Sequence, residues 1–164
     1  MKILFAADGS SFTKKALAFL VGNKNLLGLG DELIVLHVQD AISAQIERKL
    51  GSAEVTAYQQ KQSDAILKPI KKFLDKHAVN YRCLWIAGAA AGQIIEASKR
   101  ERVQMIVMGA HGHGVLSRMF MGSVAQRVLA ESDIPTLLVK QFEPSQQRKL
   151  SFNQELKPCT DEFW

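Results

Sequence analysis

Short apolar runs alternate along the chain with longer stretches in which apolar residues recur at helical spacing. Several runs are almost wholly apolar, as Leu33-Ile34-Val35-Leu36 and Ile106-Val107-Met108 show. Such runs are typical of parallel strands that helices cover on both faces. The pattern predicts strands at residues 2–7, 32–38, 81–87, 105–108 and 136–139.

Four stretches outside these strands place apolar residues on one helical face. Pro69 lies in the second stretch and predicts a kink or break, because proline removes a backbone donor and disfavours helix at the residue before it. Residues 41–58 have weaker periodicity and contain Gly51, so part of them is expected to be a loose segment near the mouth of the crevice described below. The four faces comprise Ala16, Leu17, Leu20 and Val21; Ile66, Ile70, Phe73 and Leu74; Ala91, Ile94 and Ile95; and Val124, Ala125, Val128 and Leu129.

The alternation of strands and helices predicts an α/β fold: a five-stranded open parallel sheet, Rossmann-like, with helices on both faces. Right-handed crossovers leave few strand orders, of which we predict 3-2-1-4-5. Strands 1 and 4 are then neighbours, and their carboxyl ends open a crevice of the kind in which ligands bind. The last strand follows Pro135 and is expected at the sheet edge, where residues 134–140 could pair with the same strand of a second copy.

Length and composition indicate one domain of ordinary globular character, with 164 residues, 47% hydrophobic and 23% charged. We expect the domain to span residues 1–142 and a polar tail to span 143–164. The tail either docks through its apolar residues or is disordered, and the sequence does not favour one over the other. No apolar stretch approaches the roughly 20 residues that span a bilayer, and we expect a cytoplasmic protein with no membrane partner.

The net charge of +5 would suit a polyanionic partner, but the basic residues are scattered in pairs such as Lys14-Lys15 and Lys71-Lys72. No basic patch interleaves with aromatic residues, so nucleic-acid binding is not expected. Cys83 and Cys159 have neither metal-ligand spacing nor the pattern of a disulfide framework, and both are expected to be free thiols.

A glycine motif follows the fourth strand directly. Gly109, Gly112, Gly122 and Ser123 are spaced as glycine, two residues, glycine, nine residues and glycine-serine, just before a helical pattern. Glycine tolerates positive φ and leaves room for a ligand against the backbone, which we expect of Gly109 and Gly112. The first amides of a helix have no partner inside it and can bind phosphate, while the Ser123 hydroxyl could cap the helix or donate to the ligand.

Other polar residues flank the same crevice. Asp8 ends the first strand, where its carboxylate could accept from hydroxyl or amine groups of a ligand, or cap the next helix. His111, His113 and Arg118 lie in the glycine loop and could donate to phosphate, but no spacing indicates a metal site formed by protein side chains. His37 is interpreted as a histidine with satisfied hydrogen bonds in the core. The apolar residues 119–121 are expected to pack over the bound ligand or against a second subunit.

These segments together resemble the nucleotide-binding branch of the universal stress protein family. The resemblance covers residues 1–140 and rests on Ile3-Leu4-Phe5-Ala6-Ala7-Asp8-Gly9-Ser10, Leu36-His37-Val38, Ile106-Val107-Met108-Gly109-Ala110-His111-Gly112, Gly122-Ser123-Val124 and Ile134-Pro135-Thr136-Leu137-Leu138-Val139. It implies a cytoplasmic protein of stress adaptation that binds ATP, ADP or AMP and dimerises through its last strand.

The resemblance also implies roles for particular residues. Asp8 and the backbone of Val38 would contact adenosine, with Met108 and Gly109 lining the adenine and ribose end. The phosphates would lie on Gly112, Gly122, Ser123 and Val124, with Mg²⁺ shared among their oxygens and His111 beside them. Ala7, His113, Arg118 and Ala125 are further candidates.

Ala125 departs from the family pattern, because binding members often carry a hydroxyl residue there beside the terminal phosphate. Losing that hydrogen bond costs roughly 1.5–3 kcal/mol and weakens ATP relative to ADP or AMP.

Three functions remain in view at this point. The first is a nucleotide-responsive regulator, in which ATP orders the loop at residues 109–123 and so changes a surface that a partner protein or second subunit recognises. The second is an enzyme, a slow ATPase or an autophosphorylating protein with Ser117, Ser123 or a histidine as acceptor, although no general base is paired with a nucleophile. The third is a dimeric scaffold without a ligand, against which the glycine spacing argues.

Overall fold

The computed structural model describes residues 1–110 and 121–140, which form five strands and five helices. The strands are β1 (Lys2–Ala6), β2 (Glu32–Gln39), β3 (Tyr81–Ala87), β4 (Met105–Gly109) and β5 (Thr136–Val139). The helices are α1 (Ser11–Gly22), α2 (Ala44–Leu50), α3 (Ser52–Lys76), α4 (Ala90–Arg100) and α5 (Ser123–Glu131).

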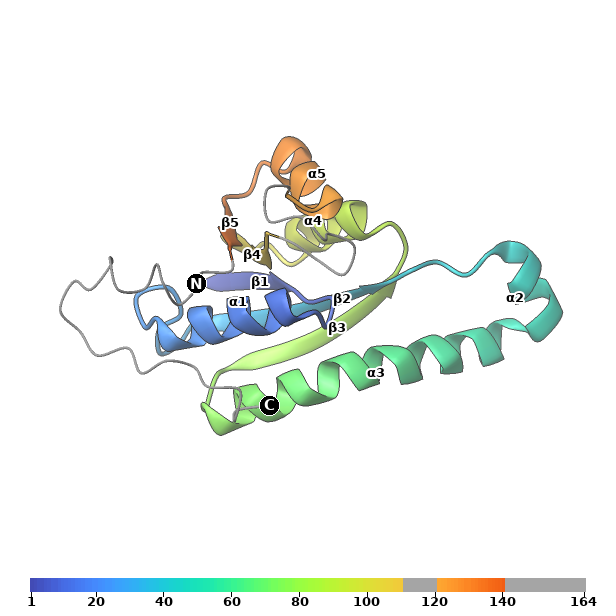
Figure 1. The fold of residues 1–164 in the computed structure, drawn as a ribbon, viewed down its shortest axis with the longest axis horizontal. Coiled ribbons are helices and arrows are strands. Elements are labelled where there is room, and N and C mark those ends of the chain that lie inside the picture. Colours follow the sequence, from blue (N-terminus) through green and yellow to red (C-terminus); the bar gives the residue numbers. More distant parts are fainter. Residues whose placement is uncertain (111–120, 141–164) are drawn as a thin grey trace.

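All four strand pairings are parallel, and the sheet has the order β3-β2-β1-β4-β5 (Figure 1). The predicted fold class and strand order are therefore confirmed. The chain builds the sheet outward from β1 to β3 and then returns, through α4, to the other side of β1. As predicted, β5 lies at an edge of the sheet, since it pairs only with β4 in the described sheet.

Each face of the sheet supports its own apolar core, because side chains alternate along a strand. In β1, Ile3 and Phe5 pack with α1 and α3, whereas Leu4 and Ala6 pack with α4 and α5. Leu17 of α1 and Leu74 of α3 are fully buried in the first core. Burying such a side chain contributes about 1.5–3 kcal/mol of stability. The two cores therefore hold the strands in place, and with them the strand ends that carry the candidate site.

Helix α3 runs from Ser52 to Lys76 with Pro69 inside it, so of the predicted kink or break, the break does not occur. Pro69 is exposed, while Leu67 and Ile70 on either side of it are 2% exposed in the core. Tertiary packing on both sides of the proline outweighs the one backbone hydrogen bond that it removes.

The loose segment expected within residues 41–58 is largely helical. Helix α2 begins at an N-cap, Ser43, whose hydroxyl accepts from the amide of Ile46. Gly51, with φ of +91°, forms the turn into α3. Figure 1 shows α2 beyond the carboxyl ends of β2 and β3, and none of its residues is buried.

Leu129 also departs from the prediction. The sequence pattern predicts Leu129 on the inward face of the last helix, but this residue is 44% exposed. Only Ala125 and Val128 of α5 are buried.

Candidate functional site

The carboxyl ends of β1 and β4 lie side by side, as the glycine motif and Asp8 require. In the sheet register Ala6 pairs with Met108 on one side and with Leu36 on the other. Asp8, Gly109 and Val38 each follow one of these positions by one or two residues. Segments a hundred residues apart in sequence thus converge at the carboxyl ends of the strands.

Asp8 helps to build the turn between β1 and α1. Its Oδ1 atom accepts from the Ser10 amide at 2.9 Å and from the Thr13 hydroxyl. The N-cap of α1 is Ser10, whose hydroxyl accepts from the Thr13 amide at 3.2 Å. The capping role considered for Asp8 thus belongs mainly to Ser10, and Asp8 orders the residues before the helix.

Gly9 is the position in this turn where glycine is required. Its φ is +80°, and a Cβ built on it would lie 3.2 Å from Ile66 of α3. A side chain there would strain the backbone and press on α3. Helix α3 therefore reaches the carboxyl end of β1 and holds the Asp8 turn in place.

The end of β2 is fixed by polar contacts on several sides. His37 is 5% exposed, with Nδ1 2.8 Å from the Ala7 carbonyl oxygen and Nε2 3.1 Å from Oε1 of Gln39. The interpretation of His37 as a satisfied core histidine is confirmed. Gly88 donates its amide to the Gln39 carbonyl at 2.9 Å, and Nε2 of Gln59 donates to the Asp40 carbonyl at 3.1 Å.

Helix α5 starts at the carboxyl end of β4. The Gly122 amide donates to the Ala110 carbonyl at 3.0 Å, and the Ala110 amide donates to the Val139 carbonyl at 3.0 Å. The Gly122 carbonyl accepts the first helical bond, from the Gln126 amide. The amides of the first helical turn therefore lack acceptors within the helix, and the positive end of the helix dipole lies at this edge.

Two local predictions about the glycine motif need correction. The N-cap of α5 is Gly122 with φ of −60°, and Ser123 is an exposed first residue of the helix, so its hydroxyl is not the cap. Gly109 is the last residue of β4, paired with Val139, and is not among the described glycines with positive φ. What Gly109 offers a ligand is its missing side chain, since its backbone is that of a strand.

Three other candidates contribute to the second core. Met108 is 5% exposed and Ala125 is 2% exposed, and both pack between the sheet and α4 and α5. Met121 is partly buried against the same core, and residues 119 and 120 lie outside the described residues. The expectation that this stretch covers a nucleotide or contacts a second subunit stays a prediction. His111, Gly112, His113 and Arg118 lie outside the described residues.

Sequence reasoning missed Gln59, and it placed Ile66 on an apolar helical face without its contact to Gly9; both residues tie α3 to the strand ends. Gln59 is 6% exposed and stands in a stripe of buried residues spaced by four, Val55, Gln59, Ser63 and Leu67. A polar residue on an apolar helical face was the available indication that α3 reaches a polar strand end.

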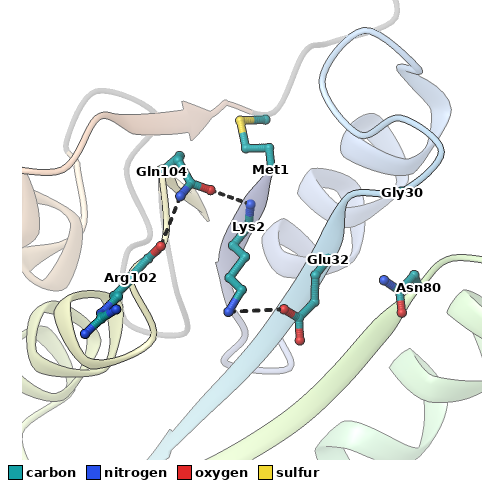
Figure 2. A pocket seen from close by; sticks show the side chains of 7 residues that line it. All are labelled: Met1, Lys2, Gly30, Glu32, Asn80, Arg102 and Gln104. Carbon is teal, nitrogen blue, oxygen red and sulfur yellow. Dashed lines mark hydrogen bonds and ion pairs between the residues drawn. The ribbon is translucent and has the colours of Figure 1, made fainter.

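A shallow hollow lies at the amino ends of the strands, on the opposite side of the sheet from the candidate site. Charged and polar side chains line it (Figure 2). Arg82 bridges Glu32 and Glu101, with Nε 2.7 Å from Glu32 and Nη2 2.5 Å from Glu101. This guanidinium lowers the pKa of both carboxyl groups, and the two carboxylates in turn raise the pKa of Arg82. Lys2 adds a contact of 3.7 Å to Glu32, so these charges neutralise one another.

Two absences apply to residues 1–110 and 121–140. No three histidine, cysteine, aspartate or glutamate side chains come together there as a metal site. None of the helices in that part of the chain has both the length and the apolar character to cross a bilayer.

The sequence profile described as the universal stress protein family matches residues 1–140. The chain belongs to this family. The resemblance given by the sequence motifs is thereby confirmed. Universal stress protein MJ0531 of Methanocaldococcus jannaschii is 28% identical over 141 residues, which are 85% of this chain and 81% of MJ0531.

Solved structures agree with this membership. MJ0577, from the same archaeon, superposes with a TM-score of 0.72 at 27% identity, over 87% of this chain and 96% of MJ0577. A universal stress protein family protein from Arabidopsis thaliana, solved with AMP bound, superposes with a TM-score of 0.63 over 89% of this chain and 95% of its own. At 18% identity, that second likeness shows a common fold.

Proposed function

We propose that this chain binds an adenine nucleotide across the carboxyl ends of β1, β2 and β4. The observation that carries the proposal is the hydrogen bond from the Gly122 amide to the Ala110 carbonyl, which brings the first turn of α5 to the end of β4. Helix amides without acceptors suit a phosphate group. Family membership and the AMP bound to the Arabidopsis relative support the choice of ligand.

The residues present fit such a ligand. The backbone amides of Ser123 and Val124, following Gly122, would hold the phosphates. The Asp8 carboxylate and the Val38 backbone would meet the adenosine, with Ala7 beside them and the strand end at Met108 and Gly109 forming the floor. His111, Gly112, His113 and Arg118 keep the phosphate roles proposed from the sequence, and a Mg²⁺ ion would be held by phosphate oxygens.

The same geometry bears on which nucleotide is preferred. Ala125 is buried in the second core, so its side chain contributes packing and supplies no hydroxyl to a terminal phosphate. We therefore expect the affinity for ATP to exceed that for ADP and AMP by less than it would with a hydroxyl residue at this position.

The biological role that follows is a cytoplasmic, nucleotide-responsive regulator of the stress response. Ligand binding would change the surface around residues 109–123, which a partner protein or a second copy recognises. The edge strand β5 supplies the surface for a homodimer through residues 134–140.

Nucleotide extracted from freshly purified protein, identified by mass spectrometry, tests the proposal directly. Thermal unfolding is then followed with ATP, ADP, AMP, cyclic AMP and GTP. A ligand at a hundred times its Kd adds about 2.7 kcal/mol of stability, so adenine nucleotides should raise Tm by several degrees and GTP should not. Release of no nucleotide, together with an unchanged Tm in ATP, would contradict the proposal. Steady ATP turnover that is lost in Asp8→Asn or Ser123→Ala would instead favour an enzyme.

A further inference from the structure

The hydrogen-bond ladder between β1 and β2 stops one rung short of the strand ends. Ala6 and Leu36 form the last pair, and the Ala7 amide still donates to the Leu36 carbonyl at 2.8 Å. In a parallel ladder the next bond would run from the Val38 amide to the Ala7 carbonyl. The His37 imidazole lies at that acceptor instead, with Nδ1 2.8 Å from the carbonyl oxygen.

The imidazole must be the donor in this contact, because a carbonyl oxygen only accepts. Nδ1 of His37 therefore carries a proton. The ring is 5% exposed, and the hydrogen bond to the Ala7 carbonyl fixes its orientation. A side chain of β2 thus replaces a backbone amide of β2 as the partner of Ala7.

The sheet register gives the direction of the amide that is replaced. Glu32 donates its amide to Met1 on the β1 side, whereas Leu33 donates to Asn80 on the β3 side. Because backbone groups alternate along a strand, even-numbered residues of β2 face β1. The amide and carbonyl of Val38 therefore point past the end of the β1 ladder, toward the turn at Asp8.

Neighbouring contacts hold the strand in this position. Gly88 and Gln59 donate to the Gln39 and Asp40 carbonyls from the β3 side and from α3. The end of β2 is consequently fixed, while the amide and carbonyl of Val38 face the β1 side beyond the last pair of the ladder. A fixed amide and carbonyl pair is complementary to adenine, which presents a ring acceptor beside an amino donor, and it is mismatched to guanine, which presents the reverse.

We propose that His37 is a positioning residue for base recognition: by occupying the Ala7 carbonyl, it keeps the Val38 backbone pair available to an adenine ring. This inference rests on the proposed nucleotide function. Without a donor at position 37, the Ala7 carbonyl takes the Val38 amide and the ladder gains its missing rung. Loss of His37 then costs adenine recognition while the fold is retained.

The test compares wild type, His37→Leu and His37→Asn by calorimetric titration with ATP, GTP and inorganic triphosphate. His37→Leu should bind ATP about tenfold more weakly, reduce the preference for ATP over GTP, and leave triphosphate binding unchanged. The Asn amide places its Nδ2–H group where Nδ1–H stands, so His37→Asn should restore ATP affinity. A purely structural role would lower Tm and weaken all three ligands together.

Amide hydrogen exchange gives a second readout. Its main comparison, with and without nucleotide, needs only the wild-type protein. The Val38 amide should exchange quickly without nucleotide and slowly with ATP, and it should be protected without nucleotide in His37→Leu. A Val38 amide already protected in the nucleotide-free wild type would overturn the inference, even if His37→Leu failed to fold.

The outcomes separate this inference from the function on which it rests. ATP binding by wild type and equally by His37→Leu would overturn the role of His37 and leave the proposed function standing. Absence of ATP binding by the wild type would overturn both.

Discussion

The two ends of the same parallel sheet are organised differently. At the amino end, Arg82 bridges Glu32 and Glu101, and the N-terminal ammonium pairs with Asp31, so charged side chains satisfy one another. At the carboxyl end, helix amides after Gly122 and the backbone of Val38 point toward the space beyond the strands. Polar side chains there, such as Asp8 and His37, mainly fix the backbone.

This contrast separates polar groups that stabilise the fold from those that suit a ligand. The hollow at the amino end is lined in part by charges that already have partners, those of Lys2, Glu32 and the N-terminal ammonium, and the strands begin there (Figure 2). At the carboxyl end the positive end of the α5 dipole favours an anion, and the strand order of the sheet reverses between the parallel neighbours β1 and β4. Variants at the carboxyl end should therefore change binding, and variants at the amino end should change stability.

The largest effect is expected from Gly122→Val. Its backbone, with φ of −60° and ψ of 146°, accommodates valine, so the fold should be retained. The side chain would occupy the phosphate position, and losing two charge-assisted bonds of about 1.5–3 kcal/mol each lowers ATP affinity at least about a hundredfold. Calorimetric titration measures the affinity and circular dichroism checks the fold. Normal ATP binding by a folded variant would show that the phosphate site lies elsewhere.

Asp8 variants should distinguish the turn from the ligand contact. Asparagine keeps the Oδ1 atom that accepts from Ser10 and Thr13, so Asp8→Asn should change the free energy of unfolding by less than about 0.5 kcal/mol. Losing the charged acceptor should weaken ATP binding about tenfold. Asp8→Ala loses both turn contacts and should cost about 1–3 kcal/mol of stability as well. If Asp8→Asn binds ATP normally, Asp8 acts only in the turn.

Arg82→Met addresses the amino end. Arg82 lowers the pKa of Glu32 and Glu101 below the ordinary value of 4.5. A carboxyl group with a lowered folded-state pKa stabilises the protein above its unfolded pKa, and this contribution is lost as pH falls through the folded value. The variant should lower Tm by a few degrees at neutral pH, and its difference from wild type should shrink below about pH 4.5.

The nucleotide affinity of the same variant shows whether the amino end of the sheet acts separately from the candidate nucleotide site. It should be unchanged in Arg82→Met, and Arg127→Met, which removes an exposed pair with Glu131, should alter Tm even less. A tenfold loss of ATP affinity in Arg82→Met would break the distinction between the two ends of the sheet.

The smallest effect concerns Tyr81, at the start of β3. Burial, together with the hydrogen bond to Asp75 at 2.7 Å, raises the pKa of Tyr81 to about 12. The raised pKa means that its contribution to stability is present below the unfolded value near 10 and is lost as pH rises toward 12. Absorbance titration should show a tyrosine component ionising near pH 12, and Tyr81→Phe should remove that component. Absence of a component near pH 12 in the wild type would contradict this.

The strands were predictable because β1 and β4 are short apolar runs that have no alternative to burial on both faces. Their order followed from general rules for parallel sheets. Helix α3 was harder to predict. Pro69 and the weak periodicity of residues 41–58 indicate an interrupted helix when the local sequence is considered alone. Packing of Leu67 and Ile70 on the sheet decided that the helix continues.

The sequence by itself determined the doubly wound fold, the convergence of Asp8 with the glycine motif, and the family, because these depend on apolar periodicity and on motif spacing. Only the tertiary structure decided that Gly109 keeps strand geometry, that Gly122 caps α5, and that His37 takes the Ala7 carbonyl. Each of those outcomes is a choice of partner between segments that are separated in sequence: Gly109 pairs with Val139, Gly122 with Ala110, and His37 with Ala7. Such choices depend on register and distance, which no local pattern encodes.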